Sequence, residues 1–168
     1  MKKLAVLAAA AVSTATFAAT PIDESLDAHG ASLLDVSNIS GSVTIEGSDR
    51  DEVHVAGSLS DAAERLDFRR DGNRIIVHVI YPEQRGNQFR DTERTVLEIS
   101  APEDLAVNVD TISAGITVDS MTGEQELSSI SGSIRTVLLG SEIRASTVSG
   151  SIFIGEEENA RVSAASVS

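Results

Sequence analysis

The sequence predicts an all-β protein whose C-terminal third is a stack of short coils, of the kind called a β-solenoid or β-helix. A phrase recurs there: Thr-Ile-Ser-Ala-Gly-Ile from Thr111, Ser-Ile-Ser-Gly-Ser-Ile from Ser129 and Thr-Val-Ser-Gly-Ser-Ile from Thr147. The copies are 18 residues apart, and a period near twenty is typical of stacked repeats. Within each copy apolar and polar residues alternate, as in strands with one buried side.

Stacking the copies in register places mostly apolar, often β-branched residues above one another. One coil cannot bury its apolar side alone, so each coil must pack on the next, and each buried Val or Ile contributes about 1.5–3 kcal/mol. We expect four columns to face a dry interior. They are Val109, Leu127, Ala145 and Ala164; Ile112, Ile130, Val148 and Val167; Ile116, Ile134 and Ile152; and Val118, Thr136 and Ile154.

A Ser-Gly corner divides each copy into two strands, as at Ser131-Gly132-Ser133. Glycine accepts torsions that a side chain disfavours, and serine hydroxyls bond to nearby backbone groups, so the corner can bend the chain in register. Residues 34–46 contain the same phrase, and they align Leu34 with Val107 and Val43 with Ile116. We expect this segment to be a separate copy of the same coil.

The N-terminal half of the domain is expected to carry an antiparallel β insertion. Residues 66–70 and 74–81 flank Asp71-Gly72-Asn73, a strong hairpin turn. Residues 60–66 carry a weak capping-box signal that predicts a single helical turn. Pro82 should end the second strand, and a polar loop should follow up to Glu93.

Residues 1–18 have the layout of a cleaved secretory signal peptide: Lys2-Lys3, an apolar run over residues 4–12, then small residues before Ala19. The apolar run is too short for a bilayer, which needs ~20 residues. We therefore expect export to the periplasm or the cell surface, with no transmembrane span in the mature chain. Residues 19–31 are expected to be a lead-in segment and 32–168 a single β-solenoid domain. Its last coil, at Val167-Ser168, is expected to be truncated.

Charge and cysteine content exclude several classes of partner and site. The formal net charge is −13 and no lysine follows Lys3, so nucleic acid and anionic lipid would be repelled. The chain has no cysteine, which excludes disulfides, thiolate metal sites, a cysteine nucleophile and the lipid-modified cysteine of a lipoprotein. The fold must be held by burial and hydrogen bonding.

No catalytic, cofactor-binding or metal-binding residues are predicted. His54 and His78 lie in expected strands and could face each other across a sheet, but a third metal ligand is missing. The acidic stretches 49–52 and 156–158 lack the glycine-rich nonapeptide of calcium-binding solenoids, so they are expected to be solvated turns. The serines are not placed in a nucleophile elbow.

The repeated phrases, the segment Ser-Ala-Pro-Glu-Asp-Leu-Ala-Val-Asn-Val before them, the earlier Asn-Ile-Ser-Gly-Ser-Val-Thr-Ile-Glu-Gly and the N-terminal leader resemble one known family. It is the bacterial putative-adhesin family, a domain of unknown function with a toast-rack or β-solenoid shape. The resemblance covers residues 32–168. It implies an exported β-solenoid and carries no catalytic or binding residues across.

Three hypotheses of function follow. The first is a non-enzymatic, adhesin-like binding or envelope scaffold module, with a cell-envelope protein or a glycan as its partner. The second is a β-helix-type enzyme acting on envelope or extracellular glycans, which needs paired carboxylates or an arginine-lined groove; Arg135 and Arg144 could line one face. The third is end-to-end self-association, because an uncapped coil exposes unpaired backbone groups.

Overall fold

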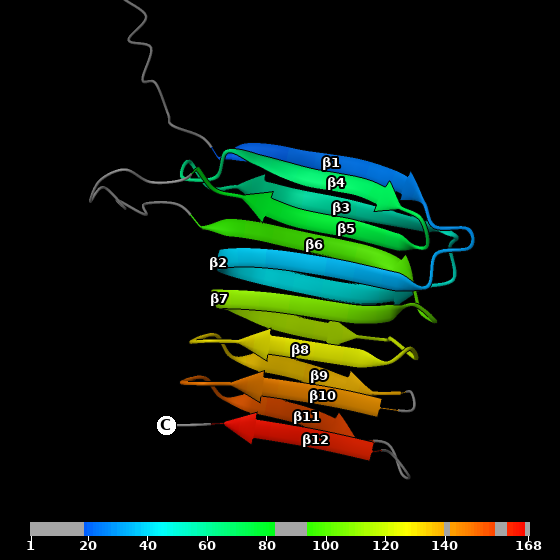
Figure 1. The fold of residues 1–168 in the computed structure, drawn as a ribbon, viewed down its shortest axis with the longest axis vertical. Helices are drawn as coiled ribbons and strands as arrows, with labels where there is room; N and C mark the ends of the chain where they lie inside the picture. Colours follow the sequence, from blue (N-terminus) through cyan, green and yellow to red (C-terminus); the bar gives the residue numbers. More distant parts are fainter. Residues whose placement is uncertain (1–18, 83–93, 140–141, 157–160, 167–168) are drawn as a thin grey trace, which may run out of the picture.

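The computed structural model describes residues 19–82, 94–139, 142–156 and 161–166. Within these ranges there is no helix, and twelve strands form one sheet that does not close on itself (Figure 1). The all-β prediction is therefore confirmed. The predicted signal peptide, the 83–93 loop and Val167-Ser168 lie outside the described residues. The strands are β1 (Thr20–Asp27), β2 (Leu33–Ser48), β3 (Glu52–Leu59), β4 (Arg65–Asp71), β5 (Arg74–Ile80), β6 (Thr95–Pro102), β7 (Ala106–Asp119), β8 (Gln125–Ser129), β9 (Ile134–Leu138), β10 (Glu142–Thr147), β11 (Ile152–Glu156) and β12 (Arg161–Ser166).

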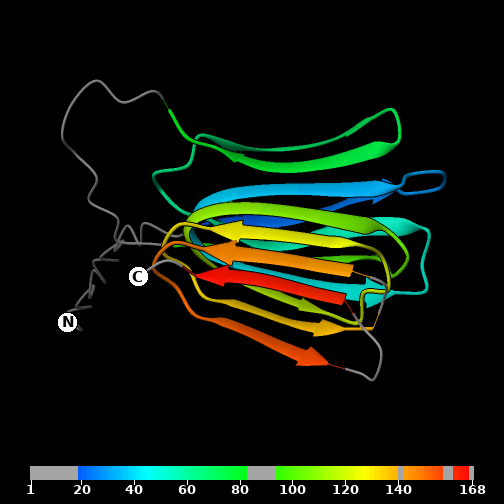
Figure 2. The same ribbon diagram turned by 60° about the horizontal axis from the view of Figure 1, so that its bottom comes forward.

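Two long strands, β2 and β7, bend in the middle and so join two layers. The first part of β2 pairs with β5 and its second part with β6, while β7 lies parallel to β2 along most of its length. The first part of β7 pairs with β8 and its second part with β9. The first layer thus continues through β8, β10 and β12, and the second through β9 and β11; both are visible in Figure 2.

Strand pairings in the C-terminal part follow the 18-residue register that the sequence predicts. Val109 pairs with Leu127, which pairs with Ala145, in parallel strands of the first layer. In the second layer Ile116 pairs with Ile134, and Ile134 with Ile152. The earlier copy also aligns as predicted, with Leu34 beside Val107 and Val43 beside Ile116.

Within the described ranges, antiparallel pairing is confined to β1, β3, β4, β5 and β6. β4 and β5 form the predicted hairpin, with Gly72 at φ 63° in its turn, a torsion that glycine adopts without strain. β1, from the lead-in segment, pairs with β3, which pairs with β6. The predicted helical turn is wrong. Ala63 N donates to Ser60 O at 3.0 Å, which closes a simple turn before β4 begins.

The core lies between the two layers and follows three of the four predicted columns. Leu127, Ala145, Ile134 and Thr136 are each no more than 3% exposed. At the C-terminal end the same columns are less covered, since Ile152 and Ile154 of β11 are half-buried and Ala164 of β12 is exposed. Burial is therefore deepest inside the stack and falls at its C-terminal end.

The column that begins with Ile112 was also predicted to be buried, and this prediction is wrong. Ile112, Ile130 and Val148 are 45%, 50% and 50% exposed, and they form an outward ridge along the bend. Alternation from the inward Val109 places position 111 inside and position 112 outside. Only after the bend do the even-numbered positions face inward, beginning with the buried Ala114. The prediction placed this change of face already at Ile112.

Polar side chains fill the inner corner instead. Asn38, Thr111, Ser129 and Thr147 are stacked in register and buried. Their hydroxyl groups form hydrogen bonds with backbone groups at the bend: Thr111 Oγ1 donates to Ala114 O at 3.0 Å, and Ser129 Oγ accepts from Gly132 N at 2.8 Å. The repeated Ser or Thr that begins each phrase is thus required because buried backbone groups at the corner need partners.

Candidate binding faces

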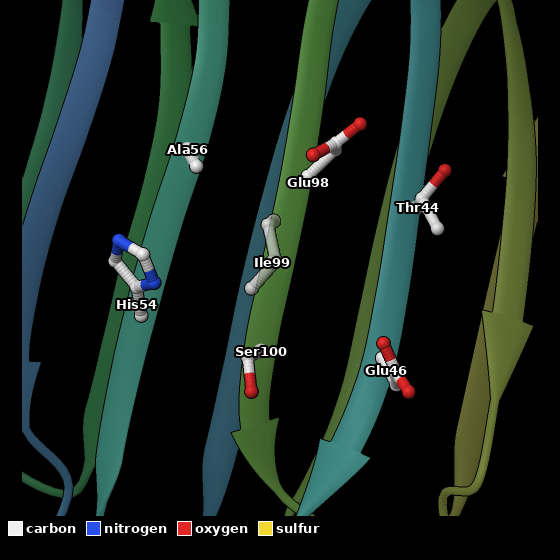
Figure 3. A pocket seen from close by; sticks show the side chains of 7 residues that line it. All are labelled: Thr44, Glu46, His54, Ala56, Glu98, Ile99 and Ser100. Carbon is white, nitrogen blue, oxygen red and sulfur yellow. The ribbon is translucent and has the colours of Figure 1, made fainter.

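Side chains outside the core point to two outer faces, one on each layer. The face on the second layer has a shallow depression of about 420 Å³ (Figure 3). It is lined by residues of β2, β3 and β6, namely Thr44, Glu46, His54, Ala56, Glu98, Ile99 and Ser100. Ile99 is buried and forms the floor, whereas the polar side chains stand on alternate positions of the three strands.

Two carboxylates share this face. Thr44 pairs with Glu98 and Glu46 with Ser100, so Glu46 and Glu98 are diagonal neighbours on adjacent parallel strands. Both are exposed, and Asp119 of β7 lies beside Glu46 in register. The face is therefore acidic and open to solvent.

His54 and His78 lie in opposite layers and do not face each other. His54 Nε2 is 2.9 Å from Asp23 Oδ1, which ties β3 to β1 on the second-layer face. His78 Nε2 is 3.5 Å from Asp35 Oδ1, and Arg74 Nη1 is 3.3 Å from Asp35 Oδ2. Among the residues that the structure describes, there is no group of three His, Cys, Asp or Glu placed to hold a metal ion.

The same face continues toward the C-terminal strands, where it carries an arginine–phenylalanine pair. Thr117, Arg135 and Phe153 are neighbours in register on β7, β9 and β11. The Arg135 guanidinium lies 5.0 Å from the centroid of the Phe153 ring, a cation–π arrangement. The ring is still 60% exposed, so it offers an apolar contact on a mainly polar face.

The face on the first layer has a second shallow depression, of about 450 Å³. Its polar lining comes from four parallel strands: Asn108, Asp110, Glu126, Ser128, Arg144, Ser146 and Ser163. The Arg144 guanidinium donates to Glu124 and lies 2.8 Å from Glu142 Oε1. The hydrogen bond that Arg144 donates to Glu124, and then the negative charge of Glu142, raise the pKa of Arg144, so its positive charge is kept and is balanced locally.

The structure also shows where the other residues considered in the sequence analysis lie. Arg135 on β9 and Arg144 on β10 belong to opposite layers, so the expectation that they could line one face is wrong. Residues 49–51 form the bend between β2 and β3 and Glu52 begins β3; Arg50 Nη1 is 3.5 Å from Glu52 Oε1. In the 156–158 stretch, residues 157 and 158 lie outside the described ranges. Sequence reasoning missed Glu46 and Glu98, although both occupy polar positions of alternating strand patterns.

Comparison with known proteins supports the fold but no family. No protein-family model matches the chain, and no curated protein matches it in sequence. The structure is similar to the crystal structure of a putative cell adhesion protein from Clostridium sporogenes, with a TM-score of 0.55 and 11% identity over 82% of this chain and 100% of that one. A putative adhesin from Parabacteroides merdae gives a TM-score of 0.30 and 7% identity over 89% of this chain and 97% of that one, too low a score to support an argument.

The similarity shows an all-β fold shared with a protein that carries an adhesion name. In the part of the chain with described coordinates, no helix has the length and apolar character needed to cross a membrane.

Proposed function

We propose that the protein is an exported, non-enzymatic β-solenoid that acts as an adhesin-like binding module or envelope scaffold. On this proposal residues 1–18 are a cleaved signal peptide, 19–31 a lead-in segment and 32–168 one solenoid domain. The absence of cysteine means that a lipid-modified cysteine cannot anchor it. The parallel 18-residue register and the similarity to a protein named for cell adhesion support the proposal.

The observation that carries the proposal is the shape of the two faces. Each depression is shallow and is lined by short polar or charged side chains from three or four neighbouring strands. Enzyme and cofactor sites are generally concave and bury most of a small ligand. A broad, ridged sheet surface is better suited to a polymer that lies across several strands, such as a glycan chain or an extended segment of an envelope protein.

Charge narrows the class of ligand for the second-layer face. Glu46, Glu98 and Asp119 give this face a negative potential within a chain of net charge −13. An anionic polymer would be repelled, whereas a neutral or amine-bearing glycan, or a basic protein segment, would be tolerated or attracted. We therefore favour a neutral or cationic envelope polymer.

A panel of neutral, cationic and anionic glycans, with the purified whole chain, tests the proposal. We expect capture of at least one neutral or cationic polymer without any release of shorter products. Glu98→Lys should weaken this binding, while Ser128→Lys on the other face should not. Binding confined to anionic glycans, or equal effects of the two variants, would contradict the assignment of the face.

One observation favours the second candidate, a glycan-acting enzyme. Glu46, Glu98 and His54 lie on one outer face, and paired carboxylates are the usual groups of glycoside hydrolysis. Product analysis with the same panel separates the two candidates. Turnover that falls at least about a hundredfold in both Glu46→Gln and Glu98→Gln, but not in Asp110→Asn on the other face, would establish the enzyme and replace the binding proposal.

A further inference from the structure

The guanidinium of Arg135 has no acidic partner among the described residues. It contacts the ring of Phe153, with 5.0 Å between the guanidinium carbon and the ring centroid. A phenyl ring offers no oxygen or nitrogen acceptor, so this contact leaves the N–H donors available. Arg135 is exposed, and its donors are therefore open to a ligand. Five other arginines in the described ranges form ion pairs with carboxylates, namely Arg50, Arg65, Arg69, Arg74 and Arg144.

Neighbours on both sides keep Arg135 on the second-layer face. β9 lies between β7 and β11, and Arg135 is beside Thr117 on the first and Phe153 on the second. Ile134 and Thr136 flank Arg135 along β9 and are 1% and 0% exposed. Alternation therefore directs the arginine side chain outward, away from the core.

The same row of the face carries a carboxylate three strands away. Thr117 is beside Thr44 of β2, and Thr44 is beside Glu98 of β6 (Figure 3). Because adjacent strands are about 4.8 Å apart, the backbone positions of Glu98 and Arg135 are roughly 14 Å apart. Asp119 lies closer, two positions after Thr117 on the same side of β7. Neither Glu98 nor Asp119 forms an ion pair within the described part of the chain, so both carboxylates are available to a cationic ligand.

We propose that Arg135 is a carboxylate-binding subsite, and that the polymer on the second-layer face is an amphoteric glycan with many amines and fewer carboxylates. This inference rests on the function proposed above and narrows its ligand. A guanidinium binds a carboxylate through two parallel N–H···O bonds, which are stronger than hydrogen bonds between neutral groups. Amines on the same polymer would lie toward Glu98 and Asp119.

The balance of charges on the face selects against polymers of a single sign. Glu46, Glu98 and Asp119 share the face with Arg135, and the net charge of the chain is −13. A purely anionic polymer would meet repulsion on most of the row, whereas a purely cationic one would place an amine beside the Arg135 guanidinium. A polymer with more amines than carboxylates avoids both penalties.

Calorimetric titration of the whole chain with one type of glycan backbone in matched forms tests the subsite. The forms are chitosan, which carries amines; lightly carboxymethylated chitosan, which carries amines and sparse carboxylates; and carboxymethylcellulose, which carries carboxylates without amines. We expect the amphoteric form to bind at least about tenfold more tightly than chitosan and carboxymethylcellulose to bind most weakly. Carboxymethylation lowers the positive charge of chitosan, so a gain in affinity for this acidic protein cannot come from net charge.

Arg135→Gln should abolish the gain, so that the affinities for chitosan and its carboxymethylated form differ by less than about twofold, and binding to chitosan should not weaken. Arg135→Lys should lose most of the gain as well, because an ammonium keeps the charge but cannot form two parallel bonds. Arg65→Gln is the matched control. It removes an exposed strand arginine from the first layer and should leave the gain unchanged.

The results distinguish failure of the subsite from failure of the proposed function. If chitosan or a neutral glycan binds but carboxylates bring no gain, the subsite is wrong and the binding function stands. Equal effects of Arg135→Gln and Arg65→Gln would also overturn the subsite alone. A preference for carboxymethylcellulose, or no binding to any of these polymers or to the neutral glycans of the panel above, would overturn both.

Discussion

Replacing Gly132 with alanine is expected to lower the free energy of unfolding by about 3 kcal/mol. A Cβ atom at this corner would lie 1.9 Å from the carbonyl oxygen of Ala114 in the preceding coil and 2.6 Å from Ser129 Oγ. Carbon and oxygen tolerate an approach of roughly 3.3 Å, so the two coils would have to separate by more than about an ångström.

The magnitude follows from what that separation disrupts. Overpacking a well-packed interior costs about 1–3 kcal/mol. The bonds from Gly132 N to Ser129 Oγ, at 2.8 Å, and from Ser131 N to Ile112 O, at 2.7 Å, hold the same corner. Weakening each adds about 0.5–1.5 kcal/mol.

Gly115→Ala is the matched control, and urea unfolding followed by circular dichroism is the assay. A Cβ on Gly115 would meet only Ser133 O, at 3.8 Å, an ordinary contact. Reduced freedom of the unfolded chain should then stabilise this variant by about 0.4–1 kcal/mol. If Gly132→Ala unfolds at the same urea concentration as Gly115→Ala, the proposed close stacking of the corners is wrong.

Three further predictions use the same unfolding measurement. Ile134→Ala should cost about 3 kcal/mol and Ile130→Ala about 1 kcal/mol or less, because Ile134 is 1% exposed and Ile130 is 50% exposed; equal losses would contradict the corrected orientation of the corner. Gln125 Nε2 is buried and has no hydrogen-bond partner among the described residues, and Gln125 Oε1 accepts from Thr136 Oγ1 at 2.6 Å. The double variant Gln125→Leu with Thr136→Val should therefore be more stable than the natural chain by about 1 kcal/mol. A double variant less stable than either single variant would contradict this. Arg144→Gln should lower the urea concentration of half-unfolding only slightly, and the loss should vanish at high salt, because the ion pairs with Glu124 and Glu142 are exposed; a large, salt-independent loss would refute this.

The sequence is sufficient to predict strand stacking because the repeat supplies its own alignment. Leu127 and Ile134 recur with apolar residues 18 positions before and after them, and the structure pairs them with those residues. The hairpin at Gly72 is predictable for a local reason, since a few turn residues determine its geometry.

The corner is where prediction from the repeat fails. Apolar recurrence at Ile112, Ile130 and Val148 looks the same whether the column points inward or outward, because a period of 18 does not reveal which face a position takes. Only the local alternation, and the need of corner backbone groups for a hydroxyl partner, places Thr111 and Ser129 inside.

The candidate faces are harder to predict than the core. Glu46 and Glu98 are 52 positions apart in the sequence, and only the parallel pairing of β2 with β6 brings them together. The antiparallel β3, inserted between these two strands in the chain, lies beyond β6 in the sheet and contributes His54 to the same face. No local motif encodes such an order of strands.

Coils that lie directly above one another at an 18-residue interval are the central feature of this fold, and a pair of introduced cysteines tests it most directly. Ser128 and Ser146 are neighbours in register on β8 and β10, and the chain has no cysteine of its own. Neighbouring strands are about 4.8 Å apart, within the span of a disulfide, whereas Ala165 is a further strand away. We predict that Ser128→Cys with Ser146→Cys forms an intramolecular disulfide and that Ser128→Cys with Ala165→Cys does not. A bridge in the second pair but not in the first would contradict the stack.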